Sequence, residues 1–237
     1  MTKETLKNVY VFNHTKFNDK SLEIRHCSAK DSKDIEETFK NLNFNVTVYN
    51  DLDYSEILEK LSDVAKMDYS NIDCVVIFVL THGRNGKVFA KDVDYYPDVY
   101  WKTLSNTNAS LFSKPKLFFV QVSRGDESED EIKLGPTIVE DSAPVTFSIP
   151  GVPDVLLLYS CYDGFNTWRS PVTGSWFVQS LCIEIKERAR NTDILTLLTC
   201  LNQRMLMRQT GALTSRQIWT TVSTLTKLLY LRFDDNK

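Results

Sequence analysis

The stretch KLFFVQVSRG, residues 116–125, contains an apolar run that ends in a short polar turn. The run is rich in aromatic and β-branched residues and does not alternate with polar ones, which is typical of a strand buried on both faces. A second such run, residues 74–80, ends at Thr81-His82-Gly83. Ser123 and His82 therefore each follow a buried strand, and both face the same crevice if the two strands run parallel.

Further apolar runs and helical patterns extend this arrangement along the chain. Runs of the same character lie at residues 9–12, 46–49 and 155–159. Apolar residues recur at helical spacing over about residues 35–42, 53–64, 176–190 and 193–207. Because strands alternate with helices, we expect a three-layer α/β sandwich with a mainly parallel sheet and helices on both faces.

The composition argues against several classes of protein. With 237 residues, 42% of them hydrophobic, the chain is long enough for one well-buried domain. The net charge of −3 gives no basic patch, so we expect no binding to nucleic acid or to a membrane surface. The sequence has neither a signal peptide nor a long apolar span, which predicts a cytoplasmic location. The five cysteines are widely spaced and predict reduced thiols, with no metal and no cofactor.

One segment departs from the alternation of strands and helices. Residues 126–141 hold seven carboxylates against one lysine, and prolines follow as far as residue 153. Charge repulsion and proline predict an exposed linker over about residues 126–153. Asp141, followed by Ser142, could be a processing site for a protease that cuts after aspartate. An acidic surface loop with no role is the alternative.

Four sequence motifs in this order resemble the caspase family of Asp-specific cysteine endopeptidases. They are residues 80–83 (LTHG), 114–118 (KPKLF), 121–125 (QVSRG) and 168–180 (WRSPVTGSWFVQS). The resemblance runs from Val9 to about Phe233, but Ser123 stands where the family has its nucleophilic cysteine. The chain is therefore similar to a pseudocaspase or decoy caspase, and we expect an insect source.

The resemblance implies a six-stranded sheet and a division of the single caspase domain. Residues 1–141 would form a region like the caspase large subunit, and residues 142–237 a region like the small subunit. The β-branched stretch 218–225 would be an edge strand that pairs with a second copy or with an active caspase. A buried internal strand is the alternative for this stretch.

The resemblance also assigns the site residues. Arg25, Gln121 and Arg169 match the pocket that holds the substrate aspartate, where guanidinium groups suit a carboxylate. Trp168 and Trp176 resemble the aromatic walls of neighbouring subsites, although Trp176 could instead belong to the core. The expected ligands are therefore Asp-containing peptide segments.

The family's catalytic positions are His82, Gly83 and Ser123. Serine is far less acidic than cysteine, so hydrolysis is expected to be lost while aspartate binding survives. We therefore expect a catalytically deficient regulator of active caspases, which agrees with the short segment before the first strand. An active cysteine endopeptidase whose nucleophile was replaced by serine is the main alternative. A serine hydrolase using Ser123, or a substitute nucleophile at Cys161, is a weaker one.

Overall fold

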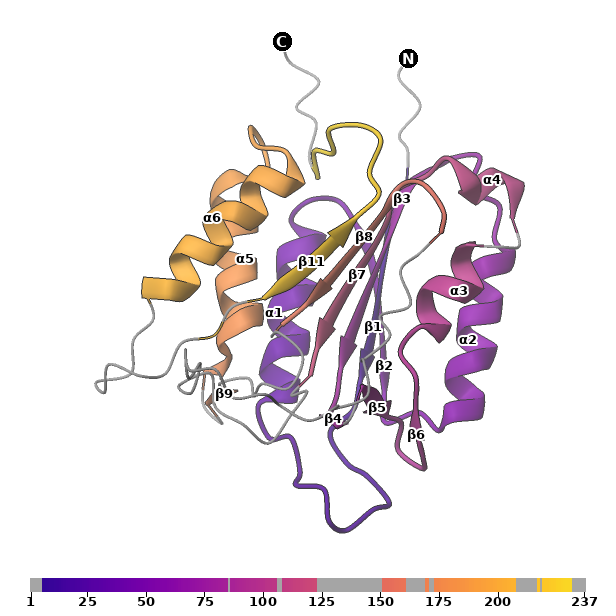
Figure 1. The fold of residues 1–237 in the computed structure, drawn as a ribbon, viewed down its shortest axis with the longest axis vertical. Helices are drawn as coiled ribbons and strands as arrows, with labels where there is room; N and C mark the ends of the chain where they lie inside the picture. The colour runs from indigo at the N-terminus through magenta and orange to yellow at the C-terminus, as the bar shows by residue number, and fades with distance from the viewer. Residues whose placement is uncertain are drawn as a thin grey trace, which may run out of the picture.

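The fold is a central twisted sheet with helices on both faces (Figure 1). The computed structural model describes residues 6–84, 86–105, 108–122, 151–160, 169–170, 173–207, 217 and 219–231. The sheet is built from β1 (Leu6–Asn13), β2 (Asn45–Asn50), β3 (Ile72–Leu80), β7 (Lys116–Gln121), β8 (Val155–Tyr159) and β11 (Thr220–Ser223). The strand order is β11-β8-β7-β3-β1-β2. Every neighbouring pair is parallel except β11 and β8, which confirms the six-stranded, mainly parallel α/β sandwich.

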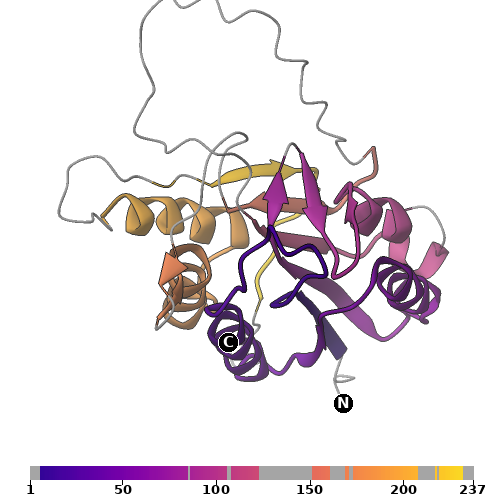
Figure 2. The ribbon, with the colours of Figure 1, turned by 90° about the horizontal axis from the view of Figure 1, so that it is seen from below.

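The helices form the two outer layers (Figures 1 and 2). One layer contains α1 (Ser28–Lys40), α5 (Trp176–Arg188) and α6 (Ile194–Met207). The other contains α2 (Tyr54–Lys66), α3 (Val99–Ser105) and α4 (Ala109–Phe112). Helix α2 begins with a capping box, since the backbone N–H of Asp53 donates to the Glu56 carboxylate at 2.8 Å. The short helices α3 and α4 were not predicted.

Neighbouring residues of the central strands point into opposite cores, because side chains alternate along a strand. Phe78 and Phe119 face α1 and α5, and their rings stack with centroids 4.7 Å apart. Ile77 and Phe118 face α2 and α3. Both faces of β3 and β7 are therefore buried, which explains why these strands lack polar alternation.

Two small antiparallel sheets were also missed by the sequence analysis. One contains β4 (Gly83–Arg84), β5 (Lys87–Phe89) and β6 (Asp94–Tyr95), and the other is the hairpin of β9 (Arg169–Ser170) and β10 (Gly174–Ser175). Strands of two or three residues are too short to give a periodic pattern.

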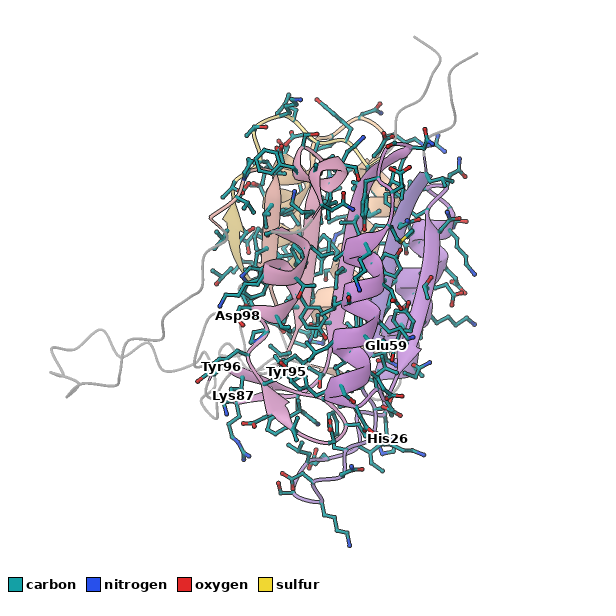
Figure 3. The ribbon with its side chains drawn as sticks, turned by 90° about the vertical axis from the view of Figure 1, so that its right-hand side faces the viewer. His26, Glu59, Lys87, Tyr95, Tyr96 and Asp98 are labelled. Atoms are coloured by element: carbon teal, nitrogen blue, oxygen red, sulfur yellow. The ribbon has the colours of Figure 1, made fainter. Side chains whose placement is uncertain are left out.

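Residues of β5, β6 and α3 line a hollow on the surface, and Figure 3 labels four of them, Lys87, Tyr95, Tyr96 and Asp98. Lys87 there pairs with Asp94 at 3.0 Å, and its ammonium lies 5.5 Å from the centre of the Tyr96 ring. The hollow has a volume of about 440 Å³, and its lining includes Tyr54 and Tyr95. Its charges are already paired within the protein.

The stretch predicted as a pairing strand forms the last strand of the sheet. Within residues 218–225, β11 covers Thr220–Ser223 and lies at the edge, antiparallel to β8. Its residues are alternately half-buried and exposed, which argues against the buried internal strand. Ile218 lies outside the described residues. Among the helices that the structure describes, none is both long and apolar enough to cross a bilayer.

Candidate active site

The candidate site lies at the carboxyl ends of the parallel strands. Asn13 at the end of β1 is opposite Leu80 of β3, and Leu80 is opposite Gln121 of β7. The backbone beyond these strands stays together, since the His14 N–H donates to the Leu80 carbonyl at 2.8 Å. The Thr81 N–H donates to the Gln121 carbonyl at 3.2 Å. The parallel arrangement that the sequence argument required is therefore present.

His82 follows β3, and a backbone carbonyl orients its ring. The His82 Nε2 lies 2.8 Å from the carbonyl oxygen of Glu23. Because a carbonyl can only accept, Nε2 carries the proton of the neutral ring, and Nδ1 is the nitrogen able to accept a proton. The Phe17 ring packs against the imidazole with centroids 5.1 Å apart. The tautomer and the orientation of His82 are therefore both defined by its neighbours.

Gly83 is the first residue of β4 and pairs with Val88 of β5. The Phe89 N–H also donates to the His82 carbonyl at 3.0 Å. The small sheet therefore fixes the backbone on both sides of the peptide bond between His82 and Gly83. The contribution of Gly83 to an oxyanion hole stays a prediction.

Arg25 lies in the loop between β1 and α1, and only 2% of its surface is exposed. Its Nη1 donates to the His14 carbonyl at 2.9 Å and to the Ser28 hydroxyl at 3.1 Å. A guanidinium buried in this way is held in one orientation by its hydrogen bonds. The loop therefore presents a fixed cation beside the ends of β1 and β3.

Gln121 and Trp176 are the other predicted site residues whose side chains the structure describes. Gln121 is buried at the end of β7, next to the strand that leads to His82. Trp176 is the first residue of α5 and is partly buried against the larger core. It therefore contributes to the core, and its role as a subsite wall stays a prediction.

The structure does not describe the side chains of the remaining predicted site residues. Ser123, Asp141 and Trp168 lie outside the described residues, as does Cys161. Arg169 is described only in its backbone, which pairs with Ser175 in the hairpin of β9 and β10.

Asp31 in α1 is a buried group that the sequence analysis missed. Its side chain is inaccessible to solvent, and its Oδ1 accepts the Ser175 N–H at 2.7 Å. Burial raises the pKa of the Asp31 carboxyl to about 6, although the Ser175 N–H and the Arg25 charge oppose this rise. A charged residue in the first turn of a helix is typical of the surface, so the sequence carried no signal for this role.

Two of the described thiols, those of Cys74 and Cys182, are unsuited to nucleophilic attack. Burial raises the pKa of Cys74 and the pKa of Cys182 to about 12, which keeps both protonated at neutral pH. Cys27 is also buried, and Cys200 is partly buried in α6. Within the part of the chain that the structure describes, these cysteines are packing residues.

A family model described as the caspase domain matches residues 7–230. The chain belongs to the caspase family. Caspase-1 of Spodoptera frugiperda is 38% identical over 198 residues, which cover 83% of this chain and 66% of that caspase. Caspase drICE of Drosophila melanogaster is 37% identical over 198 residues, covering 82% of this chain and 58% of the relative. The chain thus matches 58–66% of the length of these two caspases.

Solved caspase structures have the same fold. The crystal structure of caspase-1 from Spodoptera frugiperda superposes with a TM-score of 0.86 and 33% identity, covering 98% of this chain and 94% of that one. A structure of pro-sf-caspase-1 gives a TM-score of 0.84, also with 33% identity, and covers 100% of this chain and 94% of that one. The agreement extends across the sheet and its helical layers.

Proposed function

We propose that this chain is a caspase homologue that regulates apoptosis or proteolytic signalling and has largely lost hydrolysis. One observation carries the proposal. His82 has a defined tautomer and Arg25 a fixed position, whereas the sequence has Ser123 at the nucleophile position. At the catalytic positions that the resemblance assigns, His82 and Gly83 are retained and the nucleophile is replaced.

The chemistry of His82 supports the loss of hydrolysis. A serine hydroxyl needs a histidine whose imidazolium is stabilised by a carboxylate. The ring of His82 is oriented by a neutral carbonyl of Glu23 instead, which suffices to orient a base for a thiol. Loss of a protease nucleophile costs up to about 10⁶ in rate. Cutting is therefore nearly abolished, while the binding of a substrate segment is retained.

The proposed ligand is a peptide segment that contains aspartate. Arg25 and Arg169 supply two guanidinium groups, and Gln121 supplies an uncharged donor for the remaining carboxylate oxygen. Trp168 and Trp176 form the walls for the preceding peptide residues.

The domain is proposed to consist of two regions that can be separated by cleavage after Asp141. Residues 1–141 would be the large-subunit-like region and residues 142–237 the small-subunit-like region. The partner, a second copy or an active caspase, would pair with the edge strand β11. An exposed edge of this kind is a ready template for pairing.

Two further parts of the proposal concern source and location. The chain is 36–38% identical to caspases of Spodoptera and Drosophila and 29–32% identical to the chicken and bovine ones, which supports an insect source. The family membership supports a location in the cytoplasm.

The alternative is an active cysteine endopeptidase in which serine replaces the native cysteine. The ordered surroundings of His82 and Arg25 favour this alternative as much as they favour a decoy. The codon at position 123 of the native gene separates the two directly.

A gain-of-activity experiment tests the same question. We expect Ser123→Cys to show little cleavage of peptides ending in aspartate if the site has been inherited without function. The double variant S123C/H82A is the matched control, because it keeps the thiol and removes the base. Robust cleavage by S123C that is lost in S123C/H82A would show that the rest of the site is competent and would favour the alternative of an active endopeptidase. Continued inactivity of S123C would refute that alternative. Labelling of Ser123 by a fluorophosphonate would point instead to a serine hydrolase.

The regulatory role has its own test. The protein is mixed with an active caspase, and the rate and oligomeric state of that enzyme are measured. We expect Ser223→Lys in β11 to abolish any effect, because it places a charge on an exposed position of the pairing strand. Lys227→Ala, beyond the strand, is the control. An unchanged rate and oligomeric state with the wild-type chain would refute the regulatory role.

A further inference from the structure

The buried carboxylate of Asp31 joins two distant parts of the chain. It lies in the first turn of α1 and has no exposed surface, and its Oδ1 accepts the Ser175 N–H, 144 residues away, at 2.7 Å. Its Oδ2 has no hydrogen-bond partner among the residues that the structure describes. Burying a carboxylate with so few partners costs free energy, so this arrangement calls for a reason other than stability.

Gly174 shows how closely the chain passes over this carboxylate. Its φ of +94° lies in the region that favours glycine. A Cβ built on Gly174 would overlap Asp31 Oδ1, so no other residue fits there without displacing the carboxylate. The backbone of β10 is therefore seated directly on Asp31.

The segment seated on Asp31 also positions the backbone of Arg169. Ser175 pairs with Arg169 across the hairpin of β9 and β10. The Ser175 hydroxyl in turn accepts the Val178 N–H at 3.2 Å and caps α5. A displacement of Ser175 would therefore move both the hairpin and the beginning of α5.

Asp31 also interacts electrostatically with Arg25. The positive charge of Arg25 lowers the pKa of Asp31 against the effect of burial. Arg25 also donates to the hydroxyl of Ser28, the first residue of α1, at 3.1 Å. Arg25 is therefore hydrogen-bonded to the first turn of α1, the turn that contains Asp31.

We propose that Asp31 is a positioning residue that holds the hairpin of Arg169 in register with Arg25, so that both guanidinium groups can reach one aspartate side chain. This inference rests on the proposed aspartate-binding function. Binding of one carboxylate by two guanidinium groups tolerates displacements of these groups of only about 0.5 Å. The two arginines come from segments far apart in sequence, and the Asp31–Ser175 hydrogen bond links those segments directly.

Binding of a fluorescein-labelled peptide ending in aspartate amide, and of its asparagine counterpart, tests the proposal by fluorescence anisotropy. We expect Asp31→Ala to weaken aspartate binding at least tenfold and to reduce the preference for aspartate over asparagine. Asp31→Asn keeps the acceptor oxygen for Ser175, so it should bind within about threefold of the wild type. Asp34→Ala, on the same helix and paired with Lys30, is the matched control and should bind normally.

Gly174→Ala gives an independent perturbation, because it displaces the carboxylate without removing it. We expect it to weaken binding as Asp31→Ala does, and we expect the double variant to be no worse than either single one. If circular dichroism shows that Asp31→Ala does not fold, the proposal is tested with Gly174→Ala and Asp31→Asn.

The possible outcomes distinguish failure of the proposed aspartate binding from failure of the proposed role of Asp31. A wild type that does not prefer the aspartate peptide overturns the proposed function, and the role of Asp31 with it. A wild type with that preference, together with a folded D31A that keeps it, overturns only the role of Asp31. A residue that merely stabilises the fold would lower the Tm without changing the preference. Equal losses in D31A and D31N would show that the Ser175 hydrogen bond is not what matters.

Discussion

The buried carboxyl of Asp31 predicts that Asp31→Asn stabilises the protein increasingly as the pH rises. The pKa of Asp31 is raised in the folded state from 3.8 to about 6, chiefly by burial. Folding therefore favours the protonated carboxyl, so its contribution to stability is complete below pH 3.8 and is lost as the pH rises to about 6. Asparagine has the same shape without the titration, and it keeps its stability across this range.

The magnitude follows from the size of the pKa change. A rise from 3.8 to about 6 corresponds to about 3 kcal/mol of unfolding free energy, at 1.36 kcal/mol for each pH unit. The titratable groups that interact electrostatically with Asp31 are Arg25, Lys30, Asp34 and the thiol of Cys182, which stays neutral in this pH range. Arg25 is the buried cation among these groups, and its charge stabilises the ionised form of Asp31.

Urea unfolding of the wild type and of D31N, followed by tryptophan fluorescence from pH 4 to pH 7.5, checks this prediction. The difference in unfolding free energy between the two proteins cancels the titration of all other groups. We expect this difference to change in favour of D31N by about 2 kcal/mol between pH 4 and pH 7.5, since part of the full change occurs below pH 4. Asp34→Asn is the matched control, and its partly exposed ion pair should contribute less than about 1 kcal/mol. A D31N difference that stays constant within about 0.5 kcal/mol would refute the argument from burial.

Three further predictions concern the packing of the fold, each measured by urea unfolding. Lys116→Ala should cost about 2–4 kcal/mol, because the buried ammonium donates to three backbone carbonyls at the end of α4. Phe78→Ala should cost about 3–5 kcal/mol, since it removes the ring stacked on Phe119. Arg204→Ala should cost about 1–3 kcal/mol, because Glu184 is buried and loses one of its two arginine partners. A loss below about 0.5 kcal/mol in any of these would contradict the corresponding contact.

The sheet could be predicted from the sequence because its strands are buried on both faces. Runs such as residues 74–80 have no polar residue on either face, so their composition alone distinguishes them. The parallel arrangement then places the segments after β1, β3 and β7 at one edge. The place of His82 directly after a buried strand followed from this topology, whereas Arg25 was assigned only by the family resemblance.

The contacts that orient the site residues could not be predicted, because they join segments that are distant in the sequence. Phe17 lies in a loop without a periodic pattern, and its contact with His82 is visible only in the fold. The backbone carbonyl of Glu23 orients His82, and any residue at position 23 would offer the same carbonyl. The residue type therefore gives no indication of this contact. The burial of Asp31 likewise arises only when β10 covers it.

The adjacency of β7 and β8 has a consequence for the timing of chain cleavage. These neighbouring strands flank the linker, and Phe119 of β7 and Leu158 of β8 belong to one core. Two fragments synthesised separately would each expose a long, apolar strand edge and would aggregate before they met. A chain cut after it has folded would already have these edges paired. If the chain is processed between β7 and β8, we therefore expect the cut to follow folding, because the strand edges are then already paired.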